Sequence, residues 1–159
     1  MGVADSSSKD QQASRRWLIV ATVLFGIALV GVVALANSGS ATAELLNIVQ
    51  NIPGRDKTVH FLLMGTMALL LNLCWRAERW QMGPVPVLKG SIVVGVVVTL
   101  EEFSQLFVPL RSFSFEDLAY DYLGIFLMGQ CASFYVAWTN RDQARRSADG
   151  RGVSGADPH

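Results

Sequence analysis

The chain has 159 residues with 13 basic and 13 acidic side chains, and therefore no net charge. This balance excludes the basic surface that nucleic-acid binding requires, so we expect no nucleic-acid partner. Hydrophobic residues make up 51% of the chain and charged residues only 16%. They form four long apolar runs, each close to the roughly 20 residues that a helix needs to cross a bilayer. The composition therefore indicates an all-α, polytopic membrane protein with four transmembrane helices.

The cysteines and the absence of known sequence motifs limit the disulfides, metal sites and cofactors that can be expected. Cys74 and Cys131 both lie inside apolar runs, where an unpaired cysteine behaves as a small hydrophobic residue. We therefore expect neither a disulfide nor a metal site from them. The sequence has no CxxC, GxGxxG, Walker or HExxH motif, and we expect no cofactor.

The first apolar run spans residues 17–36 and follows a polar, Ser-rich segment at 1–14, which we interpret as a disordered cytoplasmic tail. A cleaved signal peptide is the alternative, with small-residue cleavage sites ending at Ala36 or Ala43. Its apolar core would exceed the about 7–15 residues usual for such signals. An uncleaved membrane anchor is the better interpretation.

Three further spans are expected at about 58–75, 87–107 and 118–138. The first loop contains a short amphipathic segment at 43–52 that suits the membrane surface. A short loop with the sequence Gly-Pro-Val-Pro separates the second and third spans, and a loop at 109–116 precedes the fourth. The four spans form one transmembrane domain at 15–139, and residues 140–159 are expected to be a disordered cytoplasmic tail.

The distribution of basic residues predicts the orientation. If the N-terminus is cytoplasmic, only Arg55, Lys57 and Arg111 of the 13 basic residues fall in outer loops. The other ten lie on the cytoplasmic side, as the positive-inside rule requires. We therefore expect both termini to be cytoplasmic.

Polar residues recur at the expected outer ends of spans two and three. Asp56 and His60 are four positions apart and share a helix face, so the acid can orient the imidazole. Glu102 and Gln105 share a face three residues apart, whereas Glu101 is turned by about 100° and is expected to be a headgroup-level charge. Ionisable groups in membrane-length helices are costly and by default suggest function.

The start of the fourth span adds Asp117, Asp121 and Gly124, again on one face. The two acids could bind a divalent cation or pair with Arg111 and Lys57. The guanidinium of Arg111 suits a phosphate or carboxylate ligand, or internal pairing with the acids. Whether these groups bind a ligand or only fasten helices together stays open at this point.

These residues resemble the VanZ-like family of small bacterial membrane proteins. The resemblance rests on Asp56-Lys57-x-x-His60-Phe61, Glu102-x-x-Gln105, Pro109-x-Arg111 and Asp117-x-x-x-Asp121-x-x-Gly124, and it covers about residues 51–129. It implies a helical, multi-spanning fold in the inner (cytoplasmic) membrane and a link to low-level teicoplanin resistance, but no defined reaction.

The chain departs from the family pattern at two positions. Ser104 stands where members often have His, which weakens a metal site, and Leu110 stands where they often have Gly, which implies a differently shaped loop before Arg111. Asp121 is compatible, because members often carry Asn or Asp there.

Three functions follow from these observations. The first is a non-enzymatic envelope protein whose outer polar groups bind an anionic amphiphile, such as a lipid headgroup or cell-wall precursor, or a glycopeptide. The second is a membrane-embedded hydrolase or transferase acting on a lipid-linked phosphate, with His60 as general base. The third, a transporter, is disfavoured because the sequence shows no internal repeat and no charge at the middle of a span. A homo-oligomer would be compatible with any of them.

Overall fold

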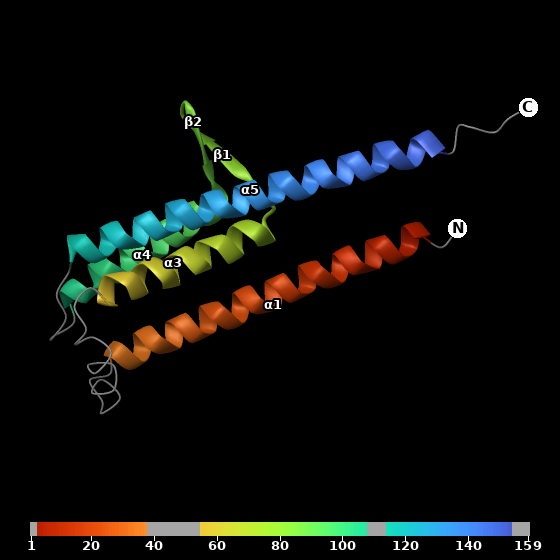
Figure 1. Ribbon diagram of the computed structural model, residues 1–159. Helices are drawn as coiled ribbons and strands as arrows, with labels where there is room; N and C mark the ends of the chain where they lie inside the picture. Colours follow the sequence, from red (N-terminus) through yellow and green to blue (C-terminus); the bar gives the residue numbers. More distant parts are fainter. Residues whose placement is uncertain (1–2, 38–54, 108–113, 154–159) are drawn as a thin grey trace, which may run out of the picture.

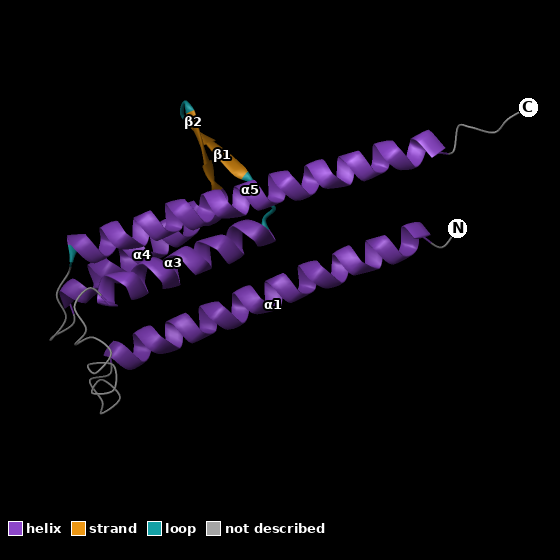
Figure 2. Ribbon diagram, in the orientation of Figure 1, coloured by secondary structure: helices purple, strands orange, loops and turns teal. Residues whose placement is uncertain are grey.

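The computed structural model describes residues 3–37, 55–107 and 114–153, and it is mostly helical (Figure 1). The described helices are α1 (Val3–Asn37), α3 (Arg55–Cys74), α4 (Lys89–Ser104) and α5 (Phe115–Val153). A short 3-10 helix, η1 (Gln105–Phe107), continues α4. Two strands, β1 (Arg79–Met82) and β2 (Val85–Leu88), stand out from the helices in Figure 2.

Three helices in the described part of the chain are long and apolar enough to cross a membrane. Their apolar segments are Gln12–Ala34, Lys57–Cys74 and Lys89–Phe107. Each overlaps a span expected from the sequence. α5 has 39 residues and is long enough, but it is not among the three helices that are both long and apolar enough to cross a membrane.

The two terminal helices are longer than the spans within them. α1 begins at Val3, inside the segment expected to be a disordered tail at 1–14, and α5 continues to Val153, beyond the expected end of the fourth span. Neither helix contains a proline, so nothing in the sequence interrupts the helical hydrogen bonds. The amphipathic segment at 43–52 and most of the loop at 109–116 lie outside the described residues.

The segment between α3 and α4 is a β-hairpin, where the sequence was interpreted as a loop followed by a helix from residue 87. Met82 pairs with Val85, which leaves Gly83-Pro84 as a two-residue turn. Gly83 has a φ of +77°, and glycine at this first turn position suits a type II′ hairpin. Pro86 is tolerated because a two-stranded ribbon has only edge strands. The third apolar helix therefore begins at Lys89.

The core of the bundle lies between α3, α4 and α5. Its buried side chains come from all three helices: Met64, Ala68, Val94, Val98 and Ile125. α1 packs against α3 and lies at the edge of the bundle in Figure 1. Many of its apolar side chains are exposed, as expected for a helix that faces lipid. The helices that carry the predicted polar residues are therefore those that pack most closely.

Candidate functional site

Two glycines bring α3 and α5 into backbone contact. A Cβ added at Gly124 would lie 2.2 Å from the carbonyl oxygen of Phe61, and one at Gly65 would lie 3.1 Å from the carbonyl oxygen of Gly124. Only residues without side chains permit such an approach. The crossing places the first turns of α3 and α5 next to each other, and this sets the geometry of the polar groups there.

His60 and Asp121 meet beside this crossing. The Nδ1 of His60 lies 3.3 Å from the Oδ2 of Asp121, across 61 positions of sequence. The Asp121 side chain is fully buried, whereas that of His60 keeps 20% of its surface exposed. The Oδ1 of Asp121 has no hydrogen-bond partner among the described residues. A buried carboxylate oxygen without a donor is costly, so this oxygen is a candidate for binding.

Glu102 is buried at the C-terminal end of α4, with 1% of its surface exposed. Its Oε1 accepts a hydrogen bond of 2.7 Å from the backbone N–H of Ser114, and its Oε2 accepts one of 3.3 Å from the Nε2 of Gln105. The same amide also donates to both carboxylate oxygens of Glu101, at 3.0 and 3.1 Å. Gln105 therefore bridges two acids, and Glu101 is part of this network rather than an isolated headgroup-level charge.

The start of α5 is capped by Ser114. The backbone N–H of Asp117 donates to its Oγ at 3.2 Å, which is the arrangement of a helix N-cap. Glu116 and Asp117 follow in the first turn, where the helix dipole favours negative charge. Ser114 thus serves two elements, because its hydroxyl caps α5 while its N–H binds the Glu102 carboxylate of α4.

Lys57 joins the start of α3 to the start of α5. Its ammonium pairs with the Glu116 carboxylate and lies 5.8 Å from the centre of the Tyr120 ring. The hydrogen bond from Lys57 lowers the pKa of Glu116 below its ordinary value, and the positive charge of Lys57 adds to this. The Glu116 side chain is 70% exposed and that of Lys57 is 37% exposed, so this pair lies at the rim of the site.

The polar cluster is defined here as the described side chains that meet at this end of the bundle: Lys57, His60, Glu101, Glu102, Gln105, Ser114, Glu116, Asp117 and Asp121. It unites residues of α3, α4, η1 and α5, with Gly124 at the crossing beside it. Two expected members lie outside this description: Arg111 is not among the described residues, and nothing is described of the Asp56 side chain. His60 is brought to Asp121, and Lys57 is brought to Glu116.

The charges of the cluster restrict its chemistry. It holds five carboxylates against one lysine and one histidine, so it suits hydrogen-bond donors or a positive group on a ligand. No group of three or more His, Cys, Asp or Glu side chains in the described part of the chain is arranged to hold a metal ion. Asp117 and Asp121 are therefore not part of such a group.

A second buried polar contact lies toward the other end of α3, and the sequence analysis did not identify it. The Nδ2 of Asn72 donates to the Oγ of Ser91 at 3.0 Å, and Asn72 is fully buried. Gly90 and Gly129 leave room for these side chains. An asparagine within an apolar run, opposite a small-residue segment of the next span, is the signal that could have found this contact.

Comparison of the chain with protein-family models, curated proteins and solved structures finds no match in any of the three.

Proposed function

We propose that this chain is a VanZ-like integral membrane protein of the bacterial cytoplasmic membrane, with four spans and both termini in the cytoplasm. In this proposal the polar cluster lies at the outer face. It binds an amphiphilic ligand, such as a lipid headgroup, cell-wall precursor or glycopeptide, and thereby alters susceptibility to wall-targeting compounds. The observation that carries the proposal is the unpartnered Oδ1 of the buried Asp121, set in a cluster built by three helices.

Acidic and basic residues of the site would contact different groups of the ligand. The carboxylates of Glu102 and Asp121 suit amino or hydroxyl groups of the ligand. Arg111, which precedes Ser114 by three positions in the sequence, supplies the contact to a phosphate or carboxylate. A ligand with both kinds of group would use both sets of residues.

Three further features support the orientation and the fourth span. α5 runs alongside α3 over its length and is long enough to span. Arg76, which follows α3, donates to Asn140 of α5 at 3.2 Å. The basic residues that follow α3 and those beyond the apolar part of α5 are thus gathered at the end opposite the polar cluster, in agreement with the positive-inside rule.

The test is the susceptibility of a bacterial strain that expresses the chain to a glycopeptide. We expect the wild-type chain to change the inhibitory concentration, and Asp121→Asn and Arg111→Ala to abolish the change at equal membrane abundance. Glu78→Gln is the matched control, because Glu78 is an exposed acid at the opposite end, where it pairs with Lys89 at 2.6 Å. The same change in all three variants as in wild type would contradict the proposal.

An enzymatic function is the second candidate, and the His60–Asp121 pair favours it. A buried carboxylate that orients an imidazole is the arrangement of a general base in many hydrolases. The reaction would be hydrolysis or transfer on a lipid-linked phosphate. Purified protein incubated with labelled lipid-linked precursors would release product if this is correct, and no turnover at any tested pH would eliminate it.

A further inference from the structure

The hairpin between α3 and α4 carries one wholly apolar face. Side chains alternate along a strand, and directly paired residues share a face. The pairs Trp80–Val87 and Met82–Val85 therefore lie on the same side of the ribbon. All four side chains are exposed, with Trp80 at 56% and Met82 at 60%.

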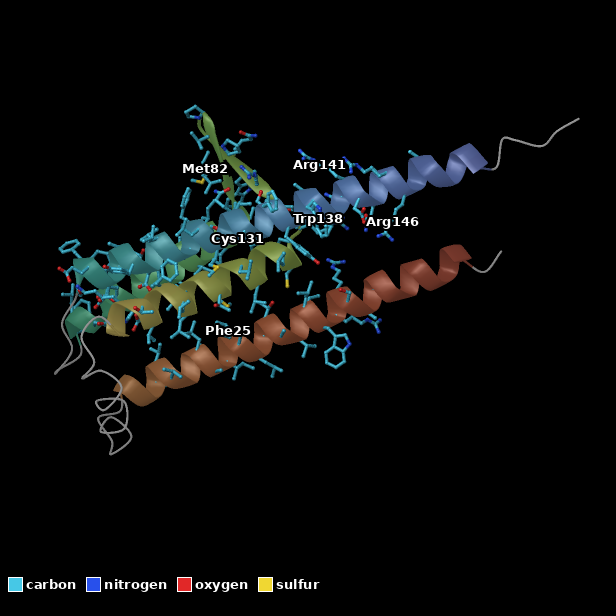
Figure 3. All side chains as sticks on the ribbon, viewed as in Figure 1. Phe25, Met82, Cys131, Trp138, Arg141 and Arg146 are labelled. Carbon is cyan, nitrogen blue, oxygen red and sulfur yellow. The ribbon has the colours of Figure 1, made fainter. Side chains whose placement is uncertain are left out.

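The opposite face of the hairpin is held by the bundle. Arg79 and Leu88 are paired on that side. The Nη2 of Arg79 donates to the Oγ of Ser133 on α5 at 2.8 Å, and Leu88 is buried. The apolar face must therefore point away from the helices, and Figure 1 shows the ribbon projecting sideways, across the direction of the helix axes. Met82 is labelled on this projecting ribbon in Figure 3.

The position of the hairpin along the bundle coincides with the tryptophans of the chain. Trp75 follows α3 directly, and Trp138 of α5 lies two residues from Asn140, the partner of Arg76. The Oγ1 of Thr22 on α1 lies 3.2 Å from the Sγ of Cys74. Trp17 precedes Thr22 by five residues, which is about 7.5 Å along a helix. All four tryptophans thus gather at one end of the bundle.

Tryptophans are enriched where a membrane meets water, because the ring is apolar and its N–H is polar. All four are exposed here: Trp17 at 73%, Trp75 at 38%, Trp80 at 56% and Trp138 at 59%. The apolar face of the hairpin lies within this belt and continues the lipid-facing surface of the helices. A free apolar surface on a two-stranded ribbon would otherwise be unfavourable, since such ribbons are only marginally stable alone.

We propose that the hairpin is a membrane-interface anchor, which lies in the plane of the bilayer and inserts Trp80, Met82, Val85 and Val87 among the lipid acyl chains and headgroups. Its partner is the bilayer itself. The inference rests on the membrane placement in the proposed function but is independent of the ligand of the polar cluster. The anchor fixes the depth of α3 and α4 and thus holds the polar cluster at the opposite bilayer surface.

Depth measurement on the full chain in nanodiscs of phosphatidylcholine and phosphatidylglycerol tests this. A background with Cys74→Ser and Cys131→Ser receives one cysteine at a time for an environment-sensitive fluorophore: Met82→Cys on the apolar face, Gln81→Cys on the opposite face, or Val97→Cys in the middle of α4. Gln81 is the matched control, because it is exposed on the same strand. Quenching is measured with aqueous iodide and with lipids that carry a nitroxide on the acyl chain.

We expect iodide to quench the label at position 82 several-fold less than that at 81, and lipid nitroxide to quench it several-fold more. Equal access of iodide to 81 and 82, with position 97 quenched by lipid, overturns the anchor but leaves the membrane placement intact. Protection of position 82 from both quenchers also overturns it, because the face is then covered by protein. If lipid does not quench position 97, the membrane placement itself fails, and the anchor with it.

Discussion

The carbonyl oxygen of Phe61 lies only 2.2 Å from the position that a Cβ at Gly124 would occupy. α3 and α5 can therefore cross as closely as they do only because residue 124 is glycine. His60 precedes this carbonyl by one position, and Asp121 lies one turn before Gly124. The close crossing is therefore the reason that the imidazole reaches a carboxylate 61 positions away. A packing residue, and not a polar one, determines the geometry of the polar cluster.

Gly124→Ala is expected to lower stability by about 1–3 kcal/mol, because the added methyl group forces the two helices apart. Thermal unfolding in mild detergent measures this. Gly31→Ala is the matched control, since a Cβ at Gly31 of α1 meets nothing within 4 Å. Alanine in a helix interior is favoured over glycine by about 0.5–1 kcal/mol, so the control is expected to keep or raise the melting temperature. Equal melting temperatures for the two variants would contradict the account of the crossing.

Gly90→Ala is expected to destabilise the bundle through Asn72. A Cβ at Gly90 would lie 2.5 Å from the Oδ1 of Asn72 and 2.9 Å from its backbone nitrogen. Asn72→Ala removes the first clash but not the second. The loss of stability in the double variant should therefore be smaller than the sum of the losses in the two single variants. A double-mutant cycle in thermal unfolding measures this coupling. Strictly additive effects would show that the two positions do not touch.

The Lys57–Glu116 pair predicts a dependence on pH. Lys57 holds the pKa of Glu116 below its ordinary value of 4.5. The pair therefore contributes stability above this value, and the contribution is lost as the pH falls through the lowered pKa in the folded state. Melting temperatures of wild type and Glu116→Gln should differ slightly at neutral pH and converge in acid. Because both groups are exposed, added salt should also reduce the difference. A difference that grows in acid would have the wrong sign.

Sequence reasoning located the three helices that are long and apolar enough to cross a membrane, and it placed most residues of the polar cluster at one end of the bundle. The length of an apolar run can be read from consecutive residues. Successive spans cross the membrane in opposite directions, and this determines which helix ends lie on the same side. The partners of individual side chains were not accessible in this way. His60 was predicted to pair with Asp56, because i and i+4 spacing is the contact that a sequence displays. The Asp56 side chain lies outside the described ones, so that pairing stays a prediction. Its contact with Asp121 depends on the approach of two helices at Gly124.

The hairpin was missed for a different reason. Prolines at positions 84 and 86 suggested an irregular loop, although Gly83-Pro84 is compatible with a two-residue turn. Apolar residues stand at every second position on either side of that turn, as Trp80 and Met82 before it and Val85 and Val87 after it. This period of two was the available signal for strands. A strand of four residues shows only two repeats of the alternating pattern. It therefore cannot be distinguished by sequence from the end of an adjacent apolar run.

The central claim is that the buried acids of the polar cluster are kept for binding and not for holding helices together. Its most direct test is the melting temperature, in mild detergent, of wild type, Glu102→Gln and Asp121→Asn. Groups retained for function are held at a cost in stability, so both variants are expected to melt at the wild-type temperature or above it. A loss of about 1–3 kcal/mol in each, the usual effect of leaving a buried hydrogen-bonding partner unsatisfied, would contradict the claim and identify the cluster as a structural network.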